Sequence, residues 1–124
     1  MDELSPNQLR RPFNTIFACL QRGKALEHYR YLDGHYIVSV DGTGQYSSKQ
    51  VHCDNCCEKD HRDGSKTYYH QMLGAAIVHP EQKVVIPLAP EPIVKGDGST
   101  KNDCERNASK RLLTDLRREH PHLK

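Results

Sequence analysis

The sequence predicts an α/β fold, with helices packed against a small antiparallel sheet. Apolar residues recur at helical spacing near both ends of the chain, and three runs rich in β-branched or aromatic residues lie between them. The predicted order is helix, strand, long polar stretch, strand, strand, helix. The 124 residues are 35% hydrophobic and contain no Trp, so we expect one domain with a thin core.

The first 33 residues are predicted to be a helical segment. Ser5 and Pro6 suit an N-cap and a first helical position, and Gly23 suits a stop. Pro12 lies inside the run and should kink or restart the helix. Residues 24–31 are predicted to add a further helical turn or two. The apolar positions of the main helix are Leu9, Phe13, Ile16, Phe17 and Leu20.

The first predicted strand covers residues 36–41, between Gly34 and Gly42. The Gly-Thr-Gly run at 42–44 predicts a loop, which opens a polar insertion over residues 42–66. Strands at 67–78 and 83–88 are close enough to pair as a hairpin. Three prolines, Pro87, Pro90 and Pro92, should then break the regular structure.

The last predicted helix covers residues 101–119 and ends before Pro121. Thr100 with Asp103, or Asn102 with Glu105, would form a capping box at its start. An α/β fold would expect another strand after this helix. The apolar stripe of the helix is Cys104, Ala108, Leu112, Leu113 and Leu116.

The charge pattern limits the classes of partner. The net charge is only +2, but residues 106–124 carry six Lys or Arg against two acids. Such a helix either contacts phosphate or has a solvated basic face. No apolar run is long enough to span a membrane, and no signal peptide opens the sequence, so we expect a cytoplasmic protein without a membrane partner. Five Cys, three of them clustered, favour metal binding over disulfides in a reducing compartment.

Asp41 ends an apolar strand and is followed by small residues, an arrangement common for a carboxylate that binds a metal ion. The strand would hold the carboxylate rigidly, and the glycines would let a phosphate or an ion approach the backbone. The alternative is an ordinary Asp-Gly turn. The run is not a P-loop, because no Gly-Lys-Ser/Thr follows it.

A second group of residues has ligand types that suit zinc. Cys53, Cys56, His61 and His70 give the spacing C-x2-C-x4-H-x8-H, and zinc binds four such ligands in a tetrahedron. His52 and Cys57 are competing ligands. The alternative is a loop with free thiols.

Glu105 is a third candidate, in the first turn of the last helix. It would either share a divalent ion with Asp41 or cap the helix, where the dipole favours an acid. Covalent hydrolase chemistry has little support, because the chain has no nucleophile elbow or comparable local signature.

Four segments together resemble bacterial insertion-sequence DDE transposases. The resemblance implies an RNase H-like catalytic core, with a topology of three antiparallel strands, a helix and a parallel fourth strand. Residues 34–124 would then be the first half of that core. The segments are YIVSVDGTGQYSS at 36–48, HCDNCCEKDH at 52–61, YYHQ at 68–71 and KNDCERNASKRLL at 101–113.

The resemblance also implies a function. Asp41 would be the first catalytic aspartate, binding Mg²⁺ or Mn²⁺, and the partner would be DNA at transposon ends. The second aspartate and the final glutamate of the family would be missing, so this N-terminal fragment should be inactive alone. Truncation should also expose one edge of strand 36–41, which favours self-association.

Two other functions stay open. The chain would serve as a small zinc-stabilised module that binds DNA or another protein, or as a complete metal nuclease that uses Asp41, Glu105 and histidines. Zinc content without nuclease activity would indicate the module, and DNA cleavage by the isolated chain would indicate the nuclease.

Overall fold

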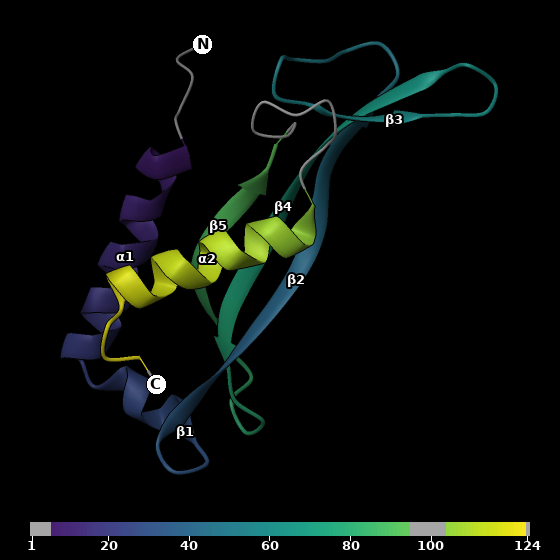
Figure 1. Ribbon diagram of the computed structural model, residues 1–124. Coiled ribbons are helices and arrows are strands. Elements are labelled where there is room, and N and C mark those ends of the chain that lie inside the picture. Colours follow the sequence, from purple (N-terminus) through teal and green to yellow (C-terminus); the bar gives the residue numbers. More distant parts are fainter. Residues whose placement is uncertain (1–5, 95–103, 124) are drawn as a thin grey trace.

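The computed structural model describes residues 6–94 and 104–123, and these form a twisted antiparallel sheet with two helices packed against it (Figure 1). The first helix, α1, runs from Pro6 to Arg22, and a 3₁₀ turn, η1, covers Ala25–Tyr29. The second helix, α2, covers Glu105–Glu119. Within the described residues, neither helix combines the length and the apolar character that crossing a bilayer requires.

The sheet has five strands, and β4 lies at its centre. The strand order is β1, β2, β4, β3, and β5 also pairs with β4. β2 pairs with β4 from Tyr68 to Val78 along one edge, while the other edge of β4 is shared by β3 near one end and β5 near the other. The strands are β1 (Arg30–Tyr31), β2 (His35–Ser48), β3 (Cys57–Asp60), β4 (Lys66–Val78) and β5 (Ile86–Ile93).

The predicted α/β class is therefore confirmed, but the prediction of a loop at 42–44 is wrong. β2 continues through both glycines to Ser48, because Asp41 to Gly44 pair without interruption with Gly74 to Gln71. The register shifts only between Gly44 and Tyr46. The segment expected to be an insertion thus contributes the second half of β2 and all of β3 to the sheet.

The predicted strand at 83–88 is also displaced, since β5 begins at Ile86 and contains Pro87, Pro90 and Pro92. Prolines are tolerated there because β5 pairs with only one neighbour, so a missing N–H can face away from the sheet. A register shift between Leu73 and Ala75 adds local irregularity. The expected break at the prolines does not occur.

The helices agree with their predicted ranges where they are described. α1 runs through Pro12 as one helix, and α2 ends at Glu119. The expected capping boxes fall partly on residues 95–103, outside the described residues. Cys104 is the N-cap residue of α2, and its side chain makes no capping bond to the helix. Leu9, Ile16 and Leu113 were expected to be buried but are exposed.

The hydrophobic core lies between the helices and one face of the sheet. The buried residues of α2 are Ala108, Leu112 and Leu116, and they face the side chains that alternate along β4. Burial of these side chains holds α2 on the sheet. The core comprises Phe17, Leu26, Tyr29, Cys57, Leu73, Ala75, Ile77, Ile86, Leu88, Ile93, Ala108, Leu112 and Leu116.

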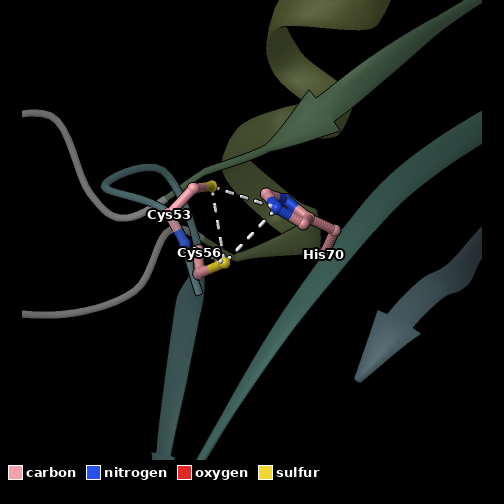
Figure 2. A group of neighbouring side chains, drawn as sticks. All are labelled: Cys53, Cys56 and His70. Atoms are coloured by element: carbon pink, nitrogen blue, oxygen red, sulfur yellow. Dashed lines mark hydrogen bonds between the residues drawn. The ribbon is translucent and has the colours of Figure 1, made fainter. Parts of the chain in front are cut away.

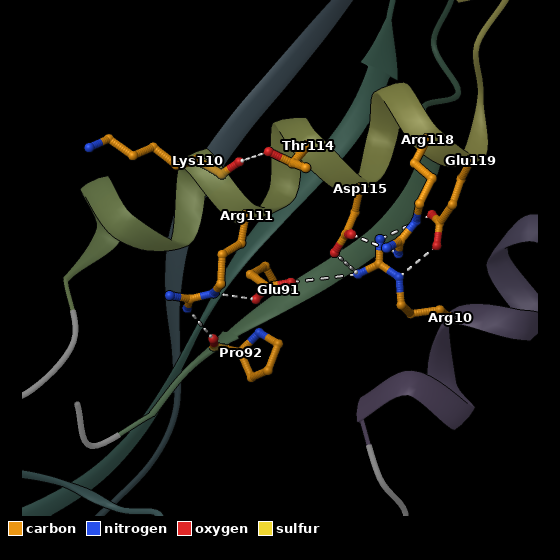
Figure 3. A network of polar contacts seen from close by, with 9 residues as sticks. All are labelled: Arg10, Glu91, Pro92, Lys110, Arg111, Thr114, Asp115, Arg118 and Glu119. Atoms are coloured by element: carbon orange, nitrogen blue, oxygen red, sulfur yellow. Dashed lines mark hydrogen bonds and ion pairs between the residues drawn. The ribbon is translucent and has the colours of Figure 1, made fainter. Parts of the chain in front are cut away.

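A network of ion pairs joins α1, β5 and α2 at the edge of this core (Figure 3). Arg10 donates two bonds to Glu119, at 2.8 and 3.0 Å, and lies 3.6 Å from Glu91 and 3.5 Å from Asp115. Only 9% of the Arg10 side chain is exposed. The bonds between Arg10 and Glu119 raise the pKa of Arg10 and lower the pKa of Glu119. The network therefore fixes the two helices relative to each other.

Candidate metal centre

Three ligand atoms converge where the segment between β2 and β3 crosses β4 (Figure 2). The Cys53 and Cys56 sulfurs lie 3.5 Å apart. The His70 Nε2 atom lies 3.2 Å from the first sulfur and 3.3 Å from the second. In the described part of the chain this is the one group of three or more Cys, His, Asp or Glu atoms close enough to share a metal ion.

The spacing suits a tetrahedral ion of zinc size. With Zn–S of about 2.3 Å and Zn–N of about 2.0–2.1 Å, tetrahedral ligands are separated by about 3.6–3.8 Å. The three atoms need to spread by only a few tenths of an ångström. The group can therefore hold a metal ion, with two sulfur ligands and one nitrogen ligand.

The local fold explains why these side chains meet. The amide of Cys56 bonds to the Cys53 carbonyl oxygen at 3.1 Å, which closes a tight turn and turns both sulfurs to one side. The Cys53 amide also donates to the Cys56 sulfur at 3.3 Å. Burial raises the pKa of the Cys56 thiol, and this amide partly opposes that rise. A bound cation would favour the thiolate.

Tyr46 supports the site and was missed in the sequence. It pairs with His70 across the β2–β4 ladder, and the two ring centroids lie 6.1 Å apart. Its hydroxyl donates to the Val51 carbonyl oxygen at 3.1 Å, so it also holds the chain that leads to Cys53. An aromatic residue in a strand is a weak signal by itself, and only the register assigns this role.

His61 does not join the group, which corrects the predicted ligand set. It begins the turn between β3 and β4, where its amide bonds to the Ser65 carbonyl oxygen, and its ring lies 2.7 Å from the Thr67 hydroxyl. Four residues of extended chain separate it from Cys57, which is about 13 Å at 3.3 Å per residue. The hairpin therefore carries His61 away from the metal ligands.

The two competing ligands lie elsewhere too. Cys57 is completely buried on the core side of the sheet, and its thiol donates to the Ile93 carbonyl oxygen at 3.5 Å. The His52 ring stacks on Tyr68, with centroids 4.2 Å apart. Strand alternation explains the first result: Cys57 pairs with Tyr69, which packs against the core, whereas His70 is the next residue of β4 and points to the other face.

Asp41 is exposed in the middle of β2, opposite Gly74. Ala75 and Leu73 of β4 are buried beneath the helices, and their β2 partners are Val40 and Gly42. Because side chains alternate along a strand, Asp41 projects from the face opposite α2. The Asp41 side chain lies on the same face as the side chain of Thr43, two residues further along β2.

Glu105 lies on the other face of β2. Its carboxylate sits against the Gly42 backbone, where a β-carbon would collide with it, and accepts a bond from the Gln71 Nε2 atom at 3.3 Å. The structure therefore does not bring Asp41 and Glu105 together, because the strand separates the two carboxylates. Local spacing could not show this, since each face of 37–40 carries an apolar residue, Ile37 on one and Val38 and Val40 on the other.

Together these features define an α/β protein with a Cys₂His group that can bind a metal ion. Comparisons with known protein families, with curated proteins and with solved structures found no match to this chain.

Proposed function

We propose that the chain is part of a DNA strand-transfer domain of the RNase H-like class, as in the DDE transposases that it resembles, and that it is inactive alone. The observation that carries this proposal is the arrangement around β2. β2, β4 and β5 are adjacent antiparallel strands, and α2 follows them in the sequence and crosses one face of the sheet. The first four elements of an RNase H-like core have this order.

The position of Asp41 also supports the proposal. Beyond Tyr36, the edge of β2 that faces away from β4 has no strand partner among the described residues. A further strand can pair along such an edge. If it carried a carboxylate, that group would lie close to Asp41.

The described residues do not form a complete site for catalytic Mg²⁺ or Mn²⁺. Within 6–94 and 104–123, Asp41 belongs to no group of three ligand atoms, and Glu105 lies across the strand. Two-metal strand transfer requires converging carboxylates, and Mg²⁺ is reluctant to give up its water for one of them. Asp41 alone is therefore assigned no step of the reaction.

The proposal is tested by cleavage of supercoiled plasmid with Mg²⁺ or Mn²⁺. We expect the 124-residue chain to leave the plasmid intact. A longer protein that contains this sequence together with a further strand and the remaining carboxylates should nick the plasmid, and Asp41→Asn should abolish this activity. Asp33→Asn removes an exposed carboxylate in the turn before β2 and serves as the control.

Two outcomes would reject the proposal. The longer protein could have no activity, or it could keep its activity after Asp41→Asn. Cleavage of the plasmid by the 124-residue chain would instead indicate a complete metal nuclease.

We also propose that the ion held by Cys53, Cys56 and His70 is zinc, in a structural role. Two thiolates and an imidazole are ligands that zinc prefers, and the ion would anchor residues 49–56, which contain almost no buried apolar side chain. Purified protein should contain one zinc per chain. Cys53→Ser with Cys56→Ser should remove it, whereas His61→Ala should retain it. Equal zinc content in all three proteins would refute this ligand set.

A second candidate function is a small zinc-stabilised module that binds DNA or a protein. The Cys53, Cys56 and His70 group favours this second candidate, because the ion would fix residues 49–56 to β4 without requiring Asp41. This candidate predicts zinc content, an intact fold and DNA binding, with no effect of Asp41→Asn in any assay. The plasmid test above therefore separates the two candidates.

A further inference from the structure

The two helices carry the excess positive charge of the chain. α1 and α2 together contain eight Lys or Arg and three acids, a net charge of +5, whereas the whole chain has +2. The remaining segments are therefore net negative. Such an asymmetry creates a local positive potential that the bulk charge does not reveal.

Two of the three acids of these helices already form ion pairs. Glu119 binds Arg10, and Asp115 binds both Arg10 and Arg118. Glu105 lies against the sheet. Five basic side chains remain exposed, and within the described ranges none of them forms an ion pair with an acid. They are Arg11 and Arg22 on α1 and Arg106, Lys110 and Arg117 on α2.

A groove of about 640 Å³ runs between α1 and the end of α2. Asn7, Arg11, Thr15 and Arg22 form one stripe along α1, at spacings of three to four residues or their multiples, and Arg118 faces them from α2. In the described part of the chain, no apolar side chain larger than alanine lines this groove, and the acid that lines it, Glu119, is paired with Arg10. At 1.5 Å per residue the stripe is about 22 Å long, which is enough to follow several phosphates.

We propose that the groove between α1 and α2, with the exposed basic side chains beside it, binds the sugar-phosphate backbone of duplex DNA. Phosphate and sugar contacts in proteins come mainly from Arg and Lys, with Asn and Thr adding hydrogen bonds, and the groove offers these residue types. An anionic membrane fits less well, because a groove without large apolar side chains cannot enter the acyl region. The choice of DNA rests on the proposed function, whereas the contact with phosphate is carried by charge and shape.

Fluorescence anisotropy with a labelled 20-base-pair duplex, between 50 and 200 mM salt, tests the inference. The test variant replaces Arg11, Arg22 and Arg118, which line the groove, and the neighbouring Arg117 by Gln, a change that helices tolerate. The matched control replaces Lys49, Lys59, Arg62 and Lys83 by Gln, which removes the same charge from exposed positions outside the helices. Far-ultraviolet circular dichroism checks that both variants are folded.

We expect the test variant to bind more weakly and with a smaller dependence on salt. If two of the four residues contact phosphate, the slope of log K against log salt falls by about 1.8, and affinity at 0.1 M salt falls about 60-fold. The control should stay within about threefold of the unaltered chain. This assay requires no cleavage, so its failure and the failure of the plasmid test are separate results.

Three outcomes would overturn the inference. The unaltered chain could fail to bind the duplex at 50 mM salt, or both variants could weaken binding equally, which would indicate net charge alone. The chain could also bind phosphatidylserine vesicles in preference to the duplex. In that case the surface would be a membrane contact.

Discussion

Replacing Arg10 by Met should loosen the packing of α1 against α2 and β5. Arg10 forms ion pairs with acids from both other elements, with Glu91 of β5 and with Asp115 and Glu119 of α2. Methionine keeps much of the aliphatic length but leaves three partly buried carboxylates without this cation. The protein should remain folded but become less stable.

The stability cost of Arg10→Met depends on which cationic partners each carboxylate keeps. Removing one partner of a buried ion pair costs about 3–5 kcal/mol. Here Glu91 keeps Arg111 at 2.7 Å and Asp115 keeps Arg118 at 2.7 Å, and only Glu119 loses its single guanidinium partner. The acids also keep 12–21% exposure, so solvent screens part of the loss. We therefore expect a cost of about 2–3 kcal/mol.

Thermal unfolding measured by circular dichroism gives the readout. For a chain of this size, 1 kcal/mol shifts Tm by about 3–6 °C, so a cost of about 2–3 kcal/mol means that Arg10→Met should lower Tm by about 6–18 °C. The Tm of Arg10→Lys should lie between those of the unaltered protein and Arg10→Met, because an ammonium group keeps the charge but cannot make the paired bonds to Glu119. Arg11→Met, on the exposed neighbour, should cost less than about 0.5 kcal/mol. Equal Tm values for the Met variants at positions 10 and 11 would show that the network contributes nothing.

Three further results are expected. Zinc at 100 times its Kd should stabilise the protein by about 2.7 kcal/mol, an effect that Cys56→Ser removes in thermal unfolding; a zinc response unchanged by that substitution would contradict the site. Burial lowers the pKa of His120, so the unfolded state takes up its proton first as pH falls below about 6.5, and stability should fall from pH 7 to pH 5. His120→Leu should flatten that decline in Tm, and an unchanged profile would exclude this histidine as its cause. The open edge of β2 should cause self-association, which light scattering should show to be weaker in Thr43→Lys; a monodisperse monomer at high concentration would argue against it.

The sequence predicted the elements whose residue types decide their structure locally. Strand 36–41 and the buried stripe of α2 depend on β-branched content and helical spacing, and both were found. The extension of β2 through Gly42 was not, because glycine usually signals a turn. Here Glu105 occupies the space where a side chain at 42 would lie, so this position requires the absence of a β-carbon. That is a contact between distant segments, which local patterns do not contain.

The candidate site shows the same division. The C-x2-C turn brings Cys53 and Cys56 together over a few residues, and the spacing found them. His61 and His70 looked equivalent in the sequence, but only the register of β3 against β4 shows which of them lies beside the sulfurs. The separation of Asp41 from Glu105 likewise depends on which face of β2 is covered, and a run of apolar residues on both faces does not reveal it.

The division of one edge of β4 between two partners has a consequence for how the protein opens. Residues 71–77 pair with β5 and lie beneath the core, whereas residues 66–69 pair with β3. Amide protons in these two stretches should therefore exchange with solvent through different events, one of them global and the other local. Removing the ion from Cys53, Cys56 and His70 should speed exchange in the β3 region and leave residues 75–77 protected. The central strand would then behave as two cooperative units joined end to end.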